Sequence, residues 1–135
     1  MREEARLLFE QAKHELEIAK HSFNGEFLDA CVFYCQQTVE KLLKAYLLIK
    51  GKSPENIHAL LKLGKMAEIP VQFNNFLKNL SSEYYISRYP DVSGEVPYKL
   101  YEKEEVETTL KETEEFVKWI KDDKIKFKIN EKKDK

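Results

Sequence analysis

The feature that most constrains this chain is the apolar run from Asp29 to Lys50, the densest in the sequence. It contains neither proline nor glycine, and Gly51 follows it where a glycine commonly ends a helix. We therefore expect one long helix from about Glu26 to Lys50. Its apolar residues occupy several faces, which is typical of a helix at the centre of a bundle or of one that also contacts a second chain. One predicted apolar stripe consists of Phe27, Cys31, Tyr34, Thr38, Leu42 and Ala45.

Polar residues of this helix also recur at helical spacing. Gln36, Glu40 and Lys44 are four residues apart, as are Gln37 and Lys41. On an exposed surface, a Glu40–Lys44 pair would contribute only a few tenths of a kcal/mol. If this side is buried, each group needs a partner, because an unpaired buried polar group costs roughly 1–3 kcal/mol. The row would then fix helix register, with Gln37 and Glu40 as candidates for a polar seam between two copies.

The rest of the chain also indicates an all-α fold. Only four glycines and four prolines occur in 135 residues, which favours helices. We expect an up-and-down antiparallel bundle of about five helices, in which the first two form a hairpin around Asn24-Gly25. The bundle would occupy residues 1–123, with a Lys-rich tail at 124–135. The other expected helices are Met1–Ser22, Asn56–Met66, Val71–Tyr84 and Glu102–Asp123.

Composition excludes some classes of function. The formal net charge is −1, so the chain is no polyanion binder by bulk electrostatics. No segment has the length of a membrane span, and the charged start lacks a signal peptide's apolar core, so we expect a cytoplasmic protein. Cys31 and Cys35 are four apart on one helix, which favours two buried thiols over a disulfide or a metal site.

The segment from Tyr85 to Tyr101 has no helical period and contains two prolines, so we expect a long, functional loop. Arg88 is its only arginine, flanked by Tyr89 and Asp91. A guanidinium beside aromatic rings suits phosphate or base recognition. The structural alternative is an ion pair from Arg88 to Asp91 or to a glutamate, with Tyr89 packed beneath it.

Three further residues are candidates for contact with an anionic ligand. Lys41 and Lys44 lie on one side of the central helix. His58 falls near the start of the third expected helix, where it could hydrogen-bond a phosphate. A histidine at that position is more often a capping or packing residue.

Several of these features together resemble the HEPN family (higher eukaryotes and prokaryotes nucleotide-binding). The matching motifs are Gln36-Gln37-x-x-Glu40-Lys41 on one helix, His58 on the next, and Arg88-Tyr-Pro-Asp91 in the loop. The resemblance implies a five-helix bundle that forms a homodimer. It also implies a nucleotide- or RNA-associated binding module that acts with a minimal nucleotidyltransferase in a toxin–antitoxin-like system. No cofactor is expected, and a nucleotide such as ATP is the candidate ligand.

One family motif is missing. Ribonuclease members carry an arginine followed four to six residues later by a histidine, but no histidine follows Arg88. This absence argues against catalysis, and we assign no catalytic or metal-binding residue. Two alternatives stay open. One is a diverged, metal-independent ribonuclease that uses Arg88, with His58 or Tyr89 in proton transfer; the other is a purely structural interaction domain.

Overall fold

The computed structural model describes residues 2–54 and 56–121, and every regular element in these ranges is a helix. Three helices are long: α1 (Arg2–Asn24), α2 (Leu28–Ile49) and α7 (Lys103–Ile120). The shorter elements lie between α2 and α7. They are α3 (Leu60–Met66), η1 (Val71–Phe73), α4 (Asn74–Ser81), α5 (Glu83–Ile86), α6 (Pro90–Ser93) and η2 (Pro97–Lys99). The predicted tail, and with it the proposed division at residue 123, lies outside the described residues.

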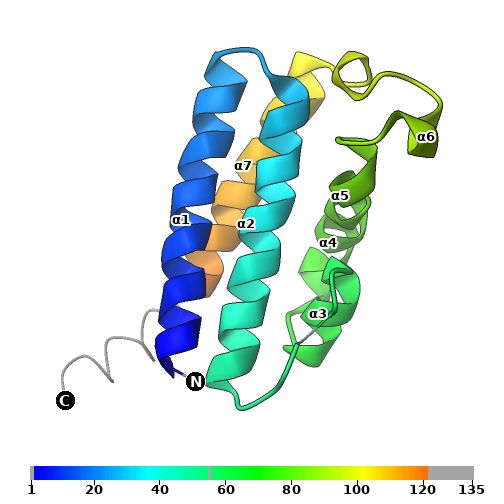
Figure 1. Cartoon of the computed structure of the whole chain (residues 1–135). Coiled ribbons are helices and arrows are strands. Elements are labelled where there is room, and N and C mark those ends of the chain that lie inside the picture. Colours follow the sequence, from blue (N-terminus) through cyan, green and yellow to red (C-terminus); the bar gives the residue numbers. More distant parts are fainter. Residues whose placement is uncertain (1, 55, 122–135) are drawn as a thin grey trace.

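The helices form an up-and-down bundle, as predicted (Figure 1). α1 and α2 run antiparallel and pack along their whole length, with α7 behind them. α5 follows α4 in the same direction beside α2, upward in Figure 1. The chain therefore reverses direction from α1 to α2, again to α4 and α5, and again to α7. The predicted α1–α2 hairpin is confirmed, and Glu26 makes its turn with a left-handed backbone (φ 65°).

The contact faces of α1 and α7 consist of residues that recur at helical spacing. Ala5, Ala12 and Ala19, spaced by seven residues, are fully buried on α1, where their small side chains allow α2 to approach closely. On α7 one stripe at helical spacing is buried. It consists of Val106, Leu110, Thr113, Phe116, Val117 and Ile120.

The central position of α2 explains why it is apolar on several faces. It packs against α1, α3, α4, α5 and α7, and both cysteines are buried free thiols, as expected. Phe27 was wrongly placed in the buried stripe, because it precedes the helix and is 67% exposed. Gly51 ends the helix as predicted. Its N–H donates to the Leu48 carbonyl and that of Lys52 to Leu47, with Gly51 at φ 80°.

The third helix begins four residues later than predicted. Asn56 adopts a left-handed conformation (φ 63°), which is incompatible with a helix start there. Instead, the Ser81 hydroxyl at the end of α4 accepts the N–H of Leu60, the first residue of α3. Lys52 donates to the carbonyl of Met66, the last residue of α3, and Lys50 to that of Ala67, its C-cap. One end of α3 is thus bonded to α4 and the other to the segment that follows α2.

The predicted loop from Tyr85 to Tyr101 is largely short helical turns. α5 continues to Ile86, and Pro90 and Pro97 each stand at the start of a further turn, α6 and η2. A proline suits the first helical position because its fixed φ is helical and its missing N–H is not needed there. Sequence periodicity cannot reveal elements of a single turn. No described helix is long and apolar enough to cross a membrane.

Candidate functional site

The polar row of α2 forms one continuous chain of hydrogen bonds. Gln36 Nε2 donates to Glu40 Oε1 (3.0 Å), and Gln37 Nε2 donates to Gln36 Oε1 (2.7 Å). Lys41 Nζ donates in turn to Gln37 Oε1 (3.1 Å), and Lys44 Nζ lies 3.0 Å from Glu40 Oε2. The predicted Glu40–Lys44 pair is thus present. Gln37 has its partners within the chain.

This polar row extends to α1, where a buried carboxylate completes it. Lys41 Nζ lies 2.9 Å from Glu15 Oε1, and Gln11 Nε2 donates to Glu15 Oε2 (3.0 Å). Glu15 Oε1 receives no hydrogen bond in the described part of the chain, so its contact with Lys41 is an ion pair without hydrogen-bond geometry. Lys41 and Lys44 each have a carboxylate partner, and an anionic ligand would have to compete with it.

Glu40 is the junction of this network. It is only 6% exposed and contacts groups from its own helix and from the segment before α3. Burial acts to raise the pKa of Glu40. Hydrogen bonds from Gln36, His58 and Lys44, with the charge of Lys44, outweigh burial and hold that pKa below its ordinary value. The carboxylate therefore stays ionised at neutral pH.

His58 joins this network to the aromatic residues of α5. Its Nδ1 lies 2.9 Å from Glu40 Oε2, and its ring stacks on Tyr84 at 5.5 Å between centroids and 21° between planes. The residue precedes α3 by two positions, and the first N–H of that helix, from Leu60, donates to Ser81 and not to His58. The capping interpretation was therefore wrong, whereas packing against Tyr84 is observed. About half of the His58 side chain is exposed.

Arg88 lies between α5 and α6, within a cluster of three aromatic rings. Its guanidinium carbon is 5.0 Å from the centroid of Phe33, 5.1 Å from Tyr84 and 4.9 Å from Tyr89. Nη2 donates to the Tyr89 hydroxyl (2.6 Å). Within the described ranges no carboxylate pairs with Arg88, so the predicted ion pair to Asp91 or a glutamate is not formed. The charge is exposed and held by π faces.

Tyr84 therefore connects two of the candidate residues that the sequence placed thirty positions apart. His58 stacks on its ring, and Arg88 lies over the same ring. Tyr85 contacts Tyr84 edge-on at 4.9 Å and is 52% exposed. All predicted site residues except Asp91 lie in one connected set. Asp91 is exposed in the first turn of α6 and is not bonded to Arg88.

A groove of about 570 Å³ opens beside His58 and Tyr84. The sequence does not indicate the other polar residues of this groove, because Lys78, Ser81 and Ser82 belong to no motif. They are brought there only by the folding of α4 against α3. The row of tyrosines at 84, 85 and 89 was the available signal for this surface. Lining residues are His58, Ala59, Leu61, Lys78, Ser81, Ser82, Tyr84 and Tyr85.

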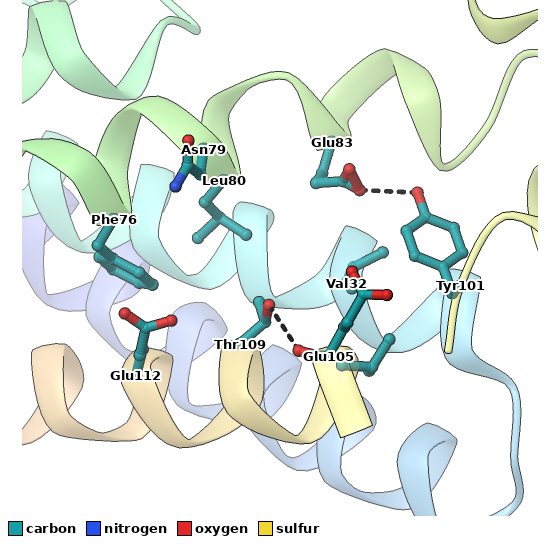
Figure 2. A pocket seen from close by; sticks show the side chains of 10 residues that line it. Val32, Phe76, Asn79, Leu80, Glu83, Tyr101, Glu105, Thr109 and Glu112 are labelled. Carbon is teal, nitrogen blue, oxygen red and sulfur yellow. Dashed lines mark hydrogen bonds between the residues drawn. The ribbon is translucent and has the colours of Figure 1, made fainter. Parts of the chain in front are cut away.

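A second cavity, of about 190 Å³, lies between α4, α5 and α7. Figure 2 shows Glu83 turned toward Tyr101, whose hydroxyl donates to Glu83 Oε2 at 2.7 Å. Glu105 and Glu112 also line it, and its lining contains no basic residue. It is therefore unsuited to phosphate. The Glu83–Tyr101 bond ties α5 to the start of α7.

Replacing Glu83 with glutamine should raise the free energy of unfolding at pH 7 by up to about 1 kcal/mol. Burial raises the pKa of Glu83 above its ordinary value, although the hydrogen bond from Tyr101 opposes this. The folded state thus disfavours the charged carboxylate of Glu83. The stability that its protonated form contributes is lost as pH rises through the raised pKa. Glutamine keeps an acceptor for Tyr101 without the charge. Urea unfolding at pH 4 and pH 7 would measure the difference.

The gain should shrink toward pH 4, where Glu83 takes up its proton in both folded and unfolded chains. Glu105→Gln, on the exposed rim of the same cavity, is the matched control and should change little at either pH. A loss of stability in Glu83→Gln that is larger at pH 7 than at pH 4 would contradict the assignment.

Fold and site together define a class of small, antiparallel helical bundles. In this chain the second helix carries a Gln–Gln–Glu–Lys row whose glutamate contacts His58, and both His58 and Arg88 contact the ring of Tyr84. The HEPN domain model matches residues 5–124, and the chain therefore belongs to the HEPN family. This confirms the resemblance seen in the sequence.

Three similar proteins are informative. A curated protein of Methanocaldococcus jannaschii, named "Putative toxin MJ1304", is 28% identical over 131 residues, which cover 87% of this chain and 86% of that protein. The protein TT1696 from Thermus thermophilus superposes with a TM-score of 0.78 and 27% identity, over 87% of this chain and 96% of that one. ST0689, an archaeal HEPN homologue, superposes with a TM-score of 0.75 and 25% identity, over 93% of this chain and 97% of that one.

Proposed function

We propose that this chain is a nucleotide- or RNA-binding module whose ligand contacts the surface around Tyr84. The observation that carries the proposal is the setting of Arg88: an exposed guanidinium, held among three aromatic rings, with no carboxylate partner in the described ranges. A structural arginine would normally be neutralised. An arginine held by π faces keeps its charge for a phosphate, and exposed tyrosines offer stacking surfaces for bases.

The candidate residues take different parts in this proposal. Arg88 contacts phosphate, while Tyr89 holds the guanidinium and presents a ring face. His58, which contacts Glu40 and stacks on Tyr84, offers the ligand a second polar contact. Asp91 is exposed near Arg88 in sequence and is available to a ligand hydroxyl. Lys41 and Lys44 contribute mainly through the network, because both are ion-paired.

The proposal extends to partners. We propose that the protein acts in the cytoplasm as a homodimer, with a minimal nucleotidyltransferase in a toxin–antitoxin-like system. Support comes from the family and from the relative named as a toxin. The apolar surplus of α2, which first suggested a dimer, is largely used within the chain. A dimer would instead use exposed apolar side chains such as Leu7 and Tyr98.

The direct test measures binding of a short single-stranded RNA and of ATP to wild-type protein and to Arg88→Ala. Losing a charge-assisted phosphate contact of about 1.5–3 kcal/mol should weaken binding by roughly tenfold to a hundredfold. Arg6→Ala is the matched control, since Arg6 is paired with Glu3 and Glu10 on α1 and should affect binding little. Fluorescence anisotropy gives the affinity, and light scattering of the same samples gives the oligomeric state.

Equal affinities of the wild-type and Arg88→Ala proteins would rule out this site. Cleavage is read from the same samples without metal. The arginine–histidine ribonuclease motif is absent, so we expect intact RNA. Cleavage that is lost in Arg88→Ala would instead establish the diverged ribonuclease.

A further inference from the structure

The groove beside Tyr84 extends along α4, away from Arg88. Lys78 and Ser81 from α4 line it, together with Tyr84 and Tyr85 from α5. Arg88 lies over the ring of Tyr84 and so belongs to the same surface. Within the described ranges, no carboxylate pairs with Lys78 and none lines the groove. The exposed side chain of Lys78 is therefore available to an anionic ligand, as is the guanidinium of Arg88.

We propose that Lys78 and Ser81 form a second phosphate subsite, and that the ligand of this surface is a single-stranded oligonucleotide, not a mononucleotide. This inference rests on the proposed function and deepens it, because it names the class of ligand and adds contacts that the Arg88 site lacks. One phosphate would contact Lys78 and another would contact Arg88. A base stacked on Tyr85 would lie between the two phosphates.

An exposed ring lies between two cations along this surface. α5 follows α4 in the same direction (Figure 1), so Lys78, Tyr85 and Arg88 follow one another along the helix axes. The N–H groups of Arg88 and Tyr89 donate to the Tyr85 carbonyl, which continues the helical path as far as Arg88. At a helical rise of about 1.5 Å per residue, Tyr85 lies roughly 10 Å beyond Lys78, and Arg88 about 5 Å beyond Tyr85. The Tyr85 side chain is half exposed and open to a base.

A single-stranded oligonucleotide matches this order of groups. Each internal nucleoside has one phosphate on its 5′ oxygen and another on its 3′ oxygen, so a base on Tyr85 has a phosphate on both sides. In ATP all phosphates form one chain on the 5′ oxygen, and they cannot reach both Lys78 and Arg88 while the base stacks between them. Stacking on an aromatic ring beside cations that follow the backbone is a common way to bind single strands.

Ser81 also has a hydrogen bond to offer in this subsite. Its Oγ accepts the N–H of Leu60 at 2.9 Å, which fixes the hydroxyl between α4 and α3. Within the described part of the chain its own proton has no acceptor, so it can be donated to a phosphate oxygen. The neighbouring Ser82 differs, because its hydroxyl already donates to the Asn79 carbonyl at 3.2 Å. Ser81 and Lys78 are one turn apart on α4 and can contact the same phosphate.

The test compares an octamer of adenosine ribonucleotides with ATP, by fluorescence anisotropy with wild type, Lys78→Ala and Arg88→Ala. Lys78→Ala should weaken binding of the octamer roughly threefold to tenfold and leave ATP binding unchanged, whereas Arg88→Ala should weaken both. A sodium chloride titration adds a second readout. Losing one phosphate contact should reduce the slope of log Kd against log salt concentration by about 0.7. Lys111→Ala removes the same charge from an exposed position on α7 and should keep both affinity and slope.

A second arm tests the ring between the two cations. Tyr85→Leu should weaken binding of the octamer by roughly tenfold, because it removes a stacking face, and Tyr85→Phe should bind like wild type. An octamer of deoxyadenosine nucleotides distinguishes DNA from RNA. Lys78-dependent binding of either octamer supports the subsite, and the tighter one identifies the source of the strand. Melting curves check that each variant is folded.

Three results would overturn the inference, and they are distinguishable from one another. Octamer binding that depends on Arg88 but not on Lys78 would eliminate the subsite and leave the proposed function standing. Equal losses of octamer and ATP binding in Lys78→Ala would show that one mononucleotide reaches both cations. No binding of either octamer or of ATP to the wild-type protein would eliminate both the subsite and the proposed function.

Discussion

Replacing Phe116 with alanine should lower the free energy of unfolding by about 3–5 kcal/mol. The side chain is fully buried on α7, and its ring contacts three others: Phe73 edge-on at 5.3 Å, Phe76 at 5.9 Å and Trp119 at 6.2 Å. Truncation removes the apolar area and leaves a cavity that these rings cannot fill. Aromatic contacts with favourable geometry add to the loss.

Thermal unfolding followed by circular dichroism would show a fall in Tm of roughly 10–15 °C. Phe27→Ala is the matched control, because that phenylalanine is 67% exposed and should cost less than about 1 kcal/mol. A loss below about 1 kcal/mol for Phe116→Ala would mean that η1 and α4 do not depend on α7 for their position.

Replacing Glu40 with alanine should lower the free energy of unfolding by about 3 kcal/mol, because it leaves one buried and two partly buried groups without their shared acceptor. Gln36 and His58 lose a hydrogen-bond partner, and the ammonium of Lys44, with a side chain only 18% exposed, loses its counter-charge. Urea unfolding at pH 7 measures the cost. Glu107→Ala, on the exposed face of α7, should stay within about 0.5 kcal/mol.

Two features separate this effect from simple loss of packing. The pKa of Glu40 lies below its ordinary value, so its contribution is present above the ordinary carboxyl range and is lost as pH falls through the lowered pKa. The difference in free energy of unfolding between wild type and Glu40→Ala should therefore become smaller at acid pH. Adding Lys44→Met to Glu40→Ala should recover part of the loss, because it removes the unpaired charge. Strict additivity of the two substitutions would argue against the pair.

The long helices could be predicted because each carries enough turns for its apolar period to be visible. Ala5, Ala12 and Ala19, spaced by seven residues, and the stripe of α7 that ends at Ile120 show such a period. The start of α3 could not be predicted, because Asn56 and its neighbours carry helix-start residues in a left-handed turn. The turns α6 and η2 are too short to show any period.

The sequence indicates candidate residues for a site but not most of the contacts between them. Periodicity along α2 grouped Gln36, Glu40 and Lys44 correctly. Glu15, the partner of Lys41, lies on α1, and His58, the partner of Glu40, lies in the segment before α3. No spacing rule links these pairs. Arg88 was expected beside Tyr89, a sequence neighbour. Its contact with Phe33, more than fifty residues earlier, depends on α5 packing against α2.

Part of the candidate site lies on the short helices α4 and α5, which affects how often its surface opens. α1, α2 and α7 bury most of the core, whereas α5 buries none of its residues and α4 only two. Elements with so little buried area open at a lower free energy than the whole domain. Amide hydrogens of α5 should therefore exchange ahead of those in α2. The surface that carries Tyr84 and Arg88 can come apart and re-form many times while the three-helix frame stays folded.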